Sequence, residues 1–107
     1  LLIRRHLFEQ VSGFNEQNLS IQFNDVDLCL KVKSLNLYNL RTPHAELYHH
    51  ESISRGLDIK PEQIDRSNKE VAYMHNTWNT QNFNDPAYNI NLSLSCEDFS
   101  LTRQVDL

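Results

Sequence analysis

Residues 23–31, FNDVDLCLK, form the stretch of sequence from which the fold is inferred. Asn24 and Asp25 are both residue types that favour the start of a helix, and apolar side chains follow on one face at helical spacing. Lysines near the end of this stretch suit the negative end of a helix dipole. We therefore predict a helix that begins at Asn24 or Asp25 and stops at Asn36, which tolerates the left-handed conformation.

The sequence before this helix predicts a short strand and a short helix. Residues 1–3 are an apolar, strand-like run. Residues 4–11 carry apolar side chains at helical spacing, and Ser12-Gly13 follows where a helix takes a left-handed C-terminal residue. A polar loop is expected from there to residue 23.

Two short strands are expected after the central helix, at residues 37–40 and 45–49. In the second strand, a period of two sends Tyr48 and His50 to one face and His49 to the other. The two histidines therefore cannot both point into one site while this strand persists.

A polar loop at residues 52–58 precedes a third predicted helix, which begins at Pro61. Its apolar side chains recur near multiples of 3.6 residues, at Ile64, Val71, Met74 and Trp78. Six asparagines then crowd between residues 76 and 91. They fit either turns or a loop that hydrogen-bonds to a polyhydroxylated ligand, and composition alone favours turns. A final short segment is expected to pack through Leu92, Leu94 and Phe99.

The composition is that of one soluble domain or a piece of one. The chain has 107 residues, of which 39% are hydrophobic and 22% charged, and a net charge of −4. Acidic and basic residues are interspersed, which argues against a nucleic-acid partner. No apolar run approaches the ~20 residues of a membrane span. We expect reduced cysteines and a cytoplasmic location, including the inner face of the membrane.

The first residue is Leu, and the apolar run at residues 1–3 has no preceding turn or cap. We therefore expect this chain to be cut from a longer protein. If the missing part supplies strands or a helix face, this piece will carry an exposed apolar seam.

Two carboxylates stand at the start of the central helix. Free backbone amides and the helix dipole favour the ionised form there, and such a carboxylate acts as a general base if a substrate hydroxyl reaches it. It can equally be an ordinary capping residue. Asp25 and Asp27 differ by roughly 200° around a helix, so at most one faces a given site.

The segment His49-His50-Glu51 could offer one imidazole to a divalent metal ion, although the histidine spacing matches no familiar zinc site. A metal-binding structural domain built on these histidines is therefore one hypothesis. Arg55, in the following loop, could hold a phosphate, although a solvated arginine is commoner.

Four motifs in order carry a more specific resemblance: VSGFNE at 11–16, FNDVDLCLK at 23–31, TPHAELYHHESISRG at 42–56 and DPAYNINLSL at 85–94. Together they resemble the C-terminal half of the catalytic domain of family 2 glycosyltransferases, nucleotide-sugar-dependent enzymes with the GT-A fold. The resemblance implies an α/β class: a partial GT-A (Rossmann-like) domain with short strands and about three helices. The N-terminal nucleotide-binding half is missing, and residues 1–107 are the acceptor-side part.

The resemblance also implies roles for individual residues. Asp25 matches the catalytic base of inverting members, which removes the proton of the acceptor hydroxyl. Asn24, the residue before it, stands where the family usually has Glu and is assigned to substrate binding. His49 matches a histidine close to a divalent metal ion, Mn²⁺ or Mg²⁺, whose remaining ligands lie outside this chain. That ion neutralises the leaving diphosphate. Arg55 resembles a residue of the lid over the diphosphate.

Two further residues are assigned structural roles and one a substrate-binding role. Asp27 matches the second acid of the family's Asp-Val-Asp-Leu run and braces the helix, and Gly13 is kept from the family pattern. Ser12 and Asn36 stand where the family usually has glycine. Trp78 is a candidate for substrate binding because an aromatic ring among amides can stack on a sugar.

We therefore expect part of an inverting glycosyltransferase that transfers a sugar from a nucleotide-sugar donor to a hydroxyl of a glycan or lipid-linked acceptor. The usual setting of such enzymes is bacterial cell-surface polysaccharide synthesis. The piece alone is expected to be inactive, because its partner is the missing N-terminal half of the same domain. The alternative is a non-catalytic carbohydrate-binding or protein-interaction module, in which Trp78, Phe83 and Tyr88 stack on sugar rings.

Overall fold

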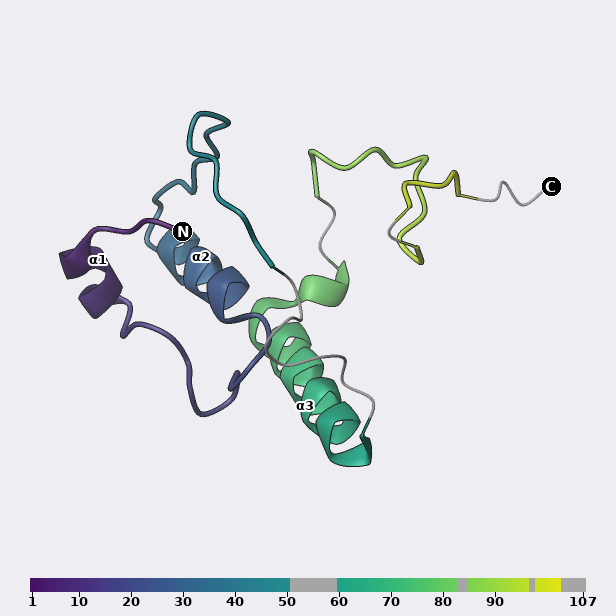
Figure 1. The fold of residues 1–107 in the computed structure, drawn as a ribbon, viewed down its shortest axis with the longest axis horizontal. Helices are drawn as coiled ribbons and strands as arrows, with labels where there is room; N and C mark the ends of the chain where they lie inside the picture. Colours follow the sequence, from purple (N-terminus) through teal and green to yellow (C-terminus); the bar gives the residue numbers. More distant parts are fainter. Residues whose placement is uncertain (51–59, 83–84, 97, 103–107) are drawn as a thin grey trace.

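The computed structural model describes residues 1–50, 60–82, 85–96 and 98–102. The regular elements of this part of the chain are α1 (Arg5–Gln10), α2 (Asn24–Ser34), α3 (Pro61–Trp78) and the 3-10 helix η1 (Thr80–Asn82). Figure 1 shows α2 between α1 and α3, with the C-terminal stretch extending away from the helices. Among the residues described, no helix combines the length and the apolar character needed to cross a bilayer.

All three predicted helices form close to their predicted ends. α2 begins at Asn24, and Asn36 beyond its end has the predicted left-handed conformation, with φ 59°. The predicted cap was wrong, because the residue before α2 is Phe23 in a left-handed conformation (φ 62°) and no side chain caps the helix. Instead, the Asp25 carboxylate accepts a hydrogen bond from the backbone N–H of Val26 at 2.9 Å.

The turn that ends α1 has the predicted left-handed backbone at both Ser12 (φ 61°) and Gly13 (φ 59°). The Gly13 N–H donates to the Phe8 carbonyl at 2.8 Å. A Cβ atom on Gly13 would lie 2.9 Å from two atoms of the Phe8 ring. The position therefore favours glycine both for its backbone angle and for the space around it.

Replacing Gly13 with Ala is expected to lower the free energy of unfolding by about 1–2 kcal/mol, the cost of a left-handed residue with a side chain. Urea denaturation followed by circular dichroism measures this loss. Ser12→Gly is the matched control, because glycine relieves the same backbone strain one residue earlier and should not destabilise the chain. A Gly13→Ala variant as stable as the parent would contradict this interpretation of the turn.

The strands predicted at residues 1–3, 37–40 and 45–49 are absent from the structure, and this prediction was wrong for the chain as it stands. The described residues contain one isolated antiparallel bridge, between Leu92 and Leu101. A strand exists only when a neighbour pairs with its backbone, so an apolar or alternating sequence is not enough. The predicted alternation is nevertheless visible, because the rings of Tyr48 and His50 stack 6.3 Å apart. The α/β class remains a prediction.

Asparagines before the Leu92–Leu101 bridge serve as turn residues. The Asn89 side chain accepts a hydrogen bond from the Asn91 N–H at 2.9 Å, and Asn79 is the left-handed residue that ends α3. This agrees with the turn interpretation of the asparagine-rich segment. The packing predicted for Leu94 and Phe99 was wrong, because these side chains are 88% and 69% exposed.

The described core is small for a chain of this length. Its buried apolar side chains are Leu19, Leu28, Val32 and Met74. The radius of gyration is 16.5 Å, against about 13 Å for a compact domain of this size. Large side chains such as Leu2, Leu40 and Tyr48 are more than 90% exposed. The chain thus carries the exposed apolar surface that the sequence led us to expect.

Candidate functional site

The candidate site is the start of α2, where the two predicted carboxylates point to different surroundings. Asp25 is exposed in the first turn, whereas Asp27 is fully buried. This is the separation that helical geometry predicts for residues two apart. Asp25 is therefore open to a ligand, and Asp27 is not.

Asp27 joins three parts of the chain. The Trp78 indole N–H donates to its Oδ1 at 2.8 Å, and the Lys31 ammonium lies 2.9 Å from its Oδ2. Lys31 also donates to the Gly13 carbonyl at 3.1 Å. Three residues singled out from the sequence, Asp27, Gly13 and Trp78, thus meet in one network that links α2 to α3 and to the turn after α1. The role of Trp78 in substrate binding remains a prediction. Its indole N–H donates to Asp27 in this structure.

A second buried carboxylate, Glu70 of α3, is 2% exposed and binds the loop before α2. It accepts hydrogen bonds from the Ser20 hydroxyl (2.8 Å), the Ile21 N–H (3.2 Å) and the Gln22 N–H (3.0 Å). Arg66 lies one turn earlier on α3, with its Nε 3.8 Å from Glu70 Oε1.

Sequence reasoning missed Glu70. One signal was available: Glu70 lies four and eight residues before Met74 and Trp78, so its carboxylate shares the apolar face of the third helix. A carboxylate at such a position is buried only when hydrogen bonds compensate its lost hydration. The sequence does not reveal the donors, which lie 48 to 50 residues earlier.

Two sets of contacts join the start of α2 to α3: the Glu70 contacts to residues 20–22 and the Trp78–Asp27 hydrogen bond. The two α3 residues are eight positions apart, which is about 12 Å along a helix. The start of α2 therefore lies between two points anchored to α3. In the view of Figure 1, the N-terminal end of α2 lies near the C-terminal end of α3, in agreement with the Trp78–Asp27 hydrogen bond.

The remaining predicted site residues are Asn24, His49 and Arg55. Asn24, partly buried beside Asp25, has an amide oxygen that is buried and has no hydrogen-bond partner among the residues described. His49 is exposed in a segment without regular structure, and Arg55 lies outside the described residues.

A divalent metal ion does not fit the described residues alone. No three histidine, cysteine or acidic side chains gather in residues 1–50, 60–82, 85–96 and 98–102. His49 could provide one ligand at most, and Zn²⁺, Mg²⁺ and Mn²⁺ need several. We therefore derive no step through a metal ion.

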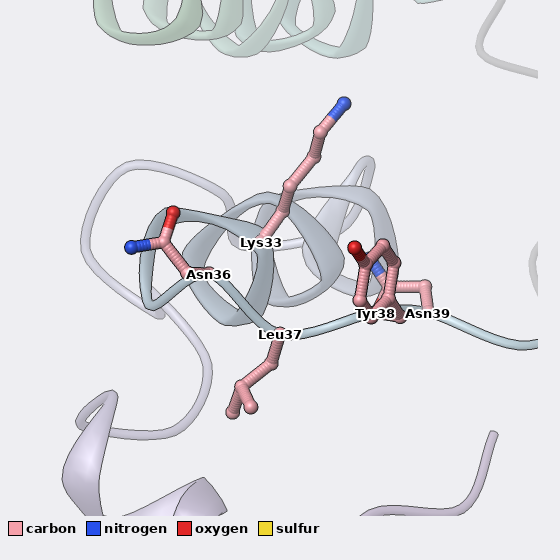
Figure 2. A pocket seen from close by; sticks show the side chains of 5 residues that line it. All are labelled: Lys33, Asn36, Leu37, Tyr38 and Asn39. Carbon is pink, nitrogen blue, oxygen red and sulfur yellow. The ribbon is translucent and has the colours of Figure 1, made fainter.

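Two hollows in the described part of the chain have linings that do not include Asp25. One is lined by Lys33, Asn36, Leu37, Tyr38 and Asn39. Figure 2 shows Lys33 and Leu37 pointing in opposite directions from the end of α2, so these side chains do not converge on a ligand. A larger hollow of about 690 Å³ lies between residues 1–10, α2 and residues 37–40, and leucines and other apolar side chains dominate its lining.

Two curated proteins are similar to almost the whole of this chain. Uncharacterized protein y4gI of Sinorhizobium fredii is 51% identical over 102 residues, which cover 95% of this chain and 11% of that protein. The O-antigen biosynthesis protein RfbC of Myxococcus xanthus is 35% identical over 103 residues, which cover 96% of this chain and 8% of that protein. The chain thus spans about a tenth of the length of these relatives. No family model and no solved structure matches it.

Proposed function

We propose that this chain is the acceptor-side part of an inverting glycosyltransferase that acts in the synthesis of bacterial cell-surface polysaccharide. The observation that carries the proposal is its 35% identity, over 96% of its length, to the O-antigen biosynthesis protein RfbC. The four motifs that resemble family 2 glycosyltransferases support the same activity. The exposed Asp25 carboxylate on an anchored helix is compatible with it.

In this proposal Asp25 is the general base. The acceptor hydroxyl attacks the anomeric carbon of the donor sugar and loses its proton to the Asp25 carboxylate. The new bond joins the acceptor oxygen to the anomeric carbon, while the bond from that carbon to the nucleoside diphosphate breaks. This single displacement inverts the configuration. A positioned base of this kind contributes about 10²- to 10⁴-fold to a rate.

The first turn of a helix suits this role. Backbone N–H groups there have no partners within the helix, and the positive end of the dipole favours an anion. Asp25 lies in this first turn, and its side chain is exposed. Asn24, next to Asp25 in the first turn of α2, is proposed to contact the acceptor.

The donor side of the reaction is assigned to the rest of the protein. The resemblance implies a divalent ion, whose chemistry would be to neutralise the departing diphosphate, with His49 and Arg55 contributing from this chain. The exposed apolar surface supports a larger domain, because side chains such as Leu2 and Leu40 would be covered by further strands of the same polypeptide. The large apolar hollow beside residues 1–3 and 37–40 lies on this surface.

A transfer assay tests the proposed function. The intact protein that contains this chain is incubated with UDP- and GDP-sugars, Mn²⁺ and a cell-envelope glycolipid fraction as acceptor. We expect acceptor-dependent release of UDP or GDP together with incorporation of the sugar. Binding of glycans without transfer from any donor would favour the carbohydrate-binding module instead.

The 107-residue chain on its own is expected not to bind UDP or GDP tightly in the presence of Mn²⁺, because the proposal assigns the nucleotide-binding elements to the other half of the domain. Isothermal titration calorimetry measures this directly. We expect a Kd weaker than about 1 mM, which is about −4 kcal/mol of binding free energy. Micromolar binding would show that the nucleotide site has been assigned to the wrong part of the protein.

A further inference from the structure

We propose that Glu70 is a positioning residue for the Asp25 carboxylate. This inference rests on the proposed function, because it assigns Asp25 the role of base. Glu70 does not touch the acceptor in this proposal. It acts by fixing the loop from which α2 begins, through three hydrogen bonds to Ser20, Ile21 and Gln22.

The start of α2 needs such support because its own sequence does not provide it. The residue before the helix, Phe23, has a left-handed backbone, and no side chain caps the first turn. A left-handed non-glycine residue persists only where surrounding contacts hold it. Glu70 supplies those contacts immediately upstream, at the N–H groups of Ile21 and Gln22. Ser67 of α3 adds a hydrogen bond to the Gln22 side chain at 2.9 Å.

A carboxylate suits this position better than an amide does. Its two oxygens, which carry only acceptor sites, receive three donors from the loop. A glutamine would turn an NH₂ group towards one of these donors and lose that hydrogen bond. The Glu70 carboxylate is 2% exposed, so water cannot replace the lost contact.

The expected consequence is a loss of turnover without a loss of donor binding. Asp25 lies three residues after Gln22, so a shift of the loop moves the first turn of α2. Transfer of a proton to a base requires hydrogen-bond distance, and a misplacement of about 1 Å in a reacting geometry can cost on the order of 100-fold. The proposal assigns donor binding to residues outside this loop, so the KM for the donor should stay unchanged.

The test compares Glu70→Gln, Ser20→Ala and Glu62→Gln in the intact protein with the transfer assay. Glu62 is the matched control, since it is an exposed glutamate on the same helix. We expect kcat to fall about 10- to 100-fold in Glu70→Gln and about 3- to 10-fold in Ser20→Ala, at unchanged donor KM. Glu62→Gln should stay within about twofold of the parent, as expected for an exposed side chain away from the loop.

A double variant separates positioning from general destabilisation. Ser20→Ala should cost nothing further in a Glu70→Ala background, because Glu70→Ala removes both carboxylate oxygens and with them the acceptor of the Ser20 hydroxyl. If Glu70→Gln does not fold, Ser20→Ala alone carries the test, since it removes one hydrogen bond from an exposed residue. A kcat loss that equals the unfolded fraction seen by circular dichroism would overturn the inference, as would a parental kcat in both single variants.

The failure of this inference differs from the failure of the proposed function. If Asp25→Asn is inactive while Ser20→Ala and Glu70→Gln keep parental turnover, Glu70 has no positioning role. If Asp25→Asn itself keeps parental turnover, the assignment of the base is wrong, and the role proposed for Glu70 is lost with it.

Discussion

Replacing Asp25 with Asn in the intact protein is expected to lower kcat for sugar transfer by about 10²- to 10⁴-fold, the usual contribution of a general base. The amide cannot accept the proton of the acceptor hydroxyl. Donor affinity should change by less than about threefold, because an interaction used only in the transition state affects kcat and not binding. Steady-state kinetics with saturating acceptor and calorimetric titration of the donor measure the two quantities separately.

The fold should tolerate this substitution. Asp25 is exposed, and the hydrogen bond from the Val26 N–H to its Oδ1 can be made equally well by an asparagine oxygen. Thermal unfolding of the variant should therefore match that of the parent. In a non-catalytic carbohydrate-binding module, the same change would leave glycan binding intact and there would be no transfer to lose.

Replacing Asp27 with Ala is expected to destabilise the chain by about 2–4 kcal/mol, the range for removing one partner of a buried, hydrogen-bonded ion pair. The change leaves the Trp78 indole N–H without its acceptor and the Lys31 ammonium without its counterion. Lys31 is 22% exposed, so partial hydration keeps the loss below that of a fully buried charge. Urea denaturation of the 107-residue chain, followed by circular dichroism, gives the free energy of unfolding.

Asp25→Ala is the matched control for this measurement, because it removes the same side chain from the same helical turn at an exposed position. It should cost about 0.5 kcal/mol, as expected for an acidic residue near a helix N-terminus. A loss in Asp27→Ala no larger than in Asp25→Ala would show that the buried network does not stabilise the chain. Trp78→Phe in both backgrounds would then isolate the contribution of the indole hydrogen bond.

The helices could be predicted from the sequence because their signals are local. The apolar spacing and the residues that end α1 and α2 are neighbours in the sequence. The structure confirms the left-handed conformation of Gly13 and Asn36. The capping of α2 could not be predicted. Phe23 adopts its left-handed backbone next to a loop held by Glu70, which lies 48 to 50 residues along the chain from its donors.

The strands could not be predicted reliably for the opposite reason. Alternation at residues 45–49 indicates which side chains share a face, and the stacked rings of Tyr48 and His50 agree with it. Whether a strand forms depends on a pairing partner, which an apolar pattern does not specify. Leu40 and Leu47 remain 93% and 86% exposed in the absence of such a partner.

At the candidate site, the geometry of a single helix predicted that Asp25 and Asp27 face different surroundings, and this is confirmed. The partners of Asp27 were beyond prediction, because Trp78 comes from a different helix 51 residues later. The roles of Asn24 and His49 remain predictions. So does that of Arg55, which lies outside the described residues.

The most direct test of the central claim compares turnover in Asp25→Asn and Glu62→Gln within the intact protein. Both variants remove an exposed carboxylate from the first turn of a helix, so they share any effect on helix dipole and solubility. We predict that kcat falls at least about 100-fold in Asp25→Asn and by less than about twofold in Glu62→Gln. Equal turnover in the two variants would contradict the assignment of Asp25 as the base.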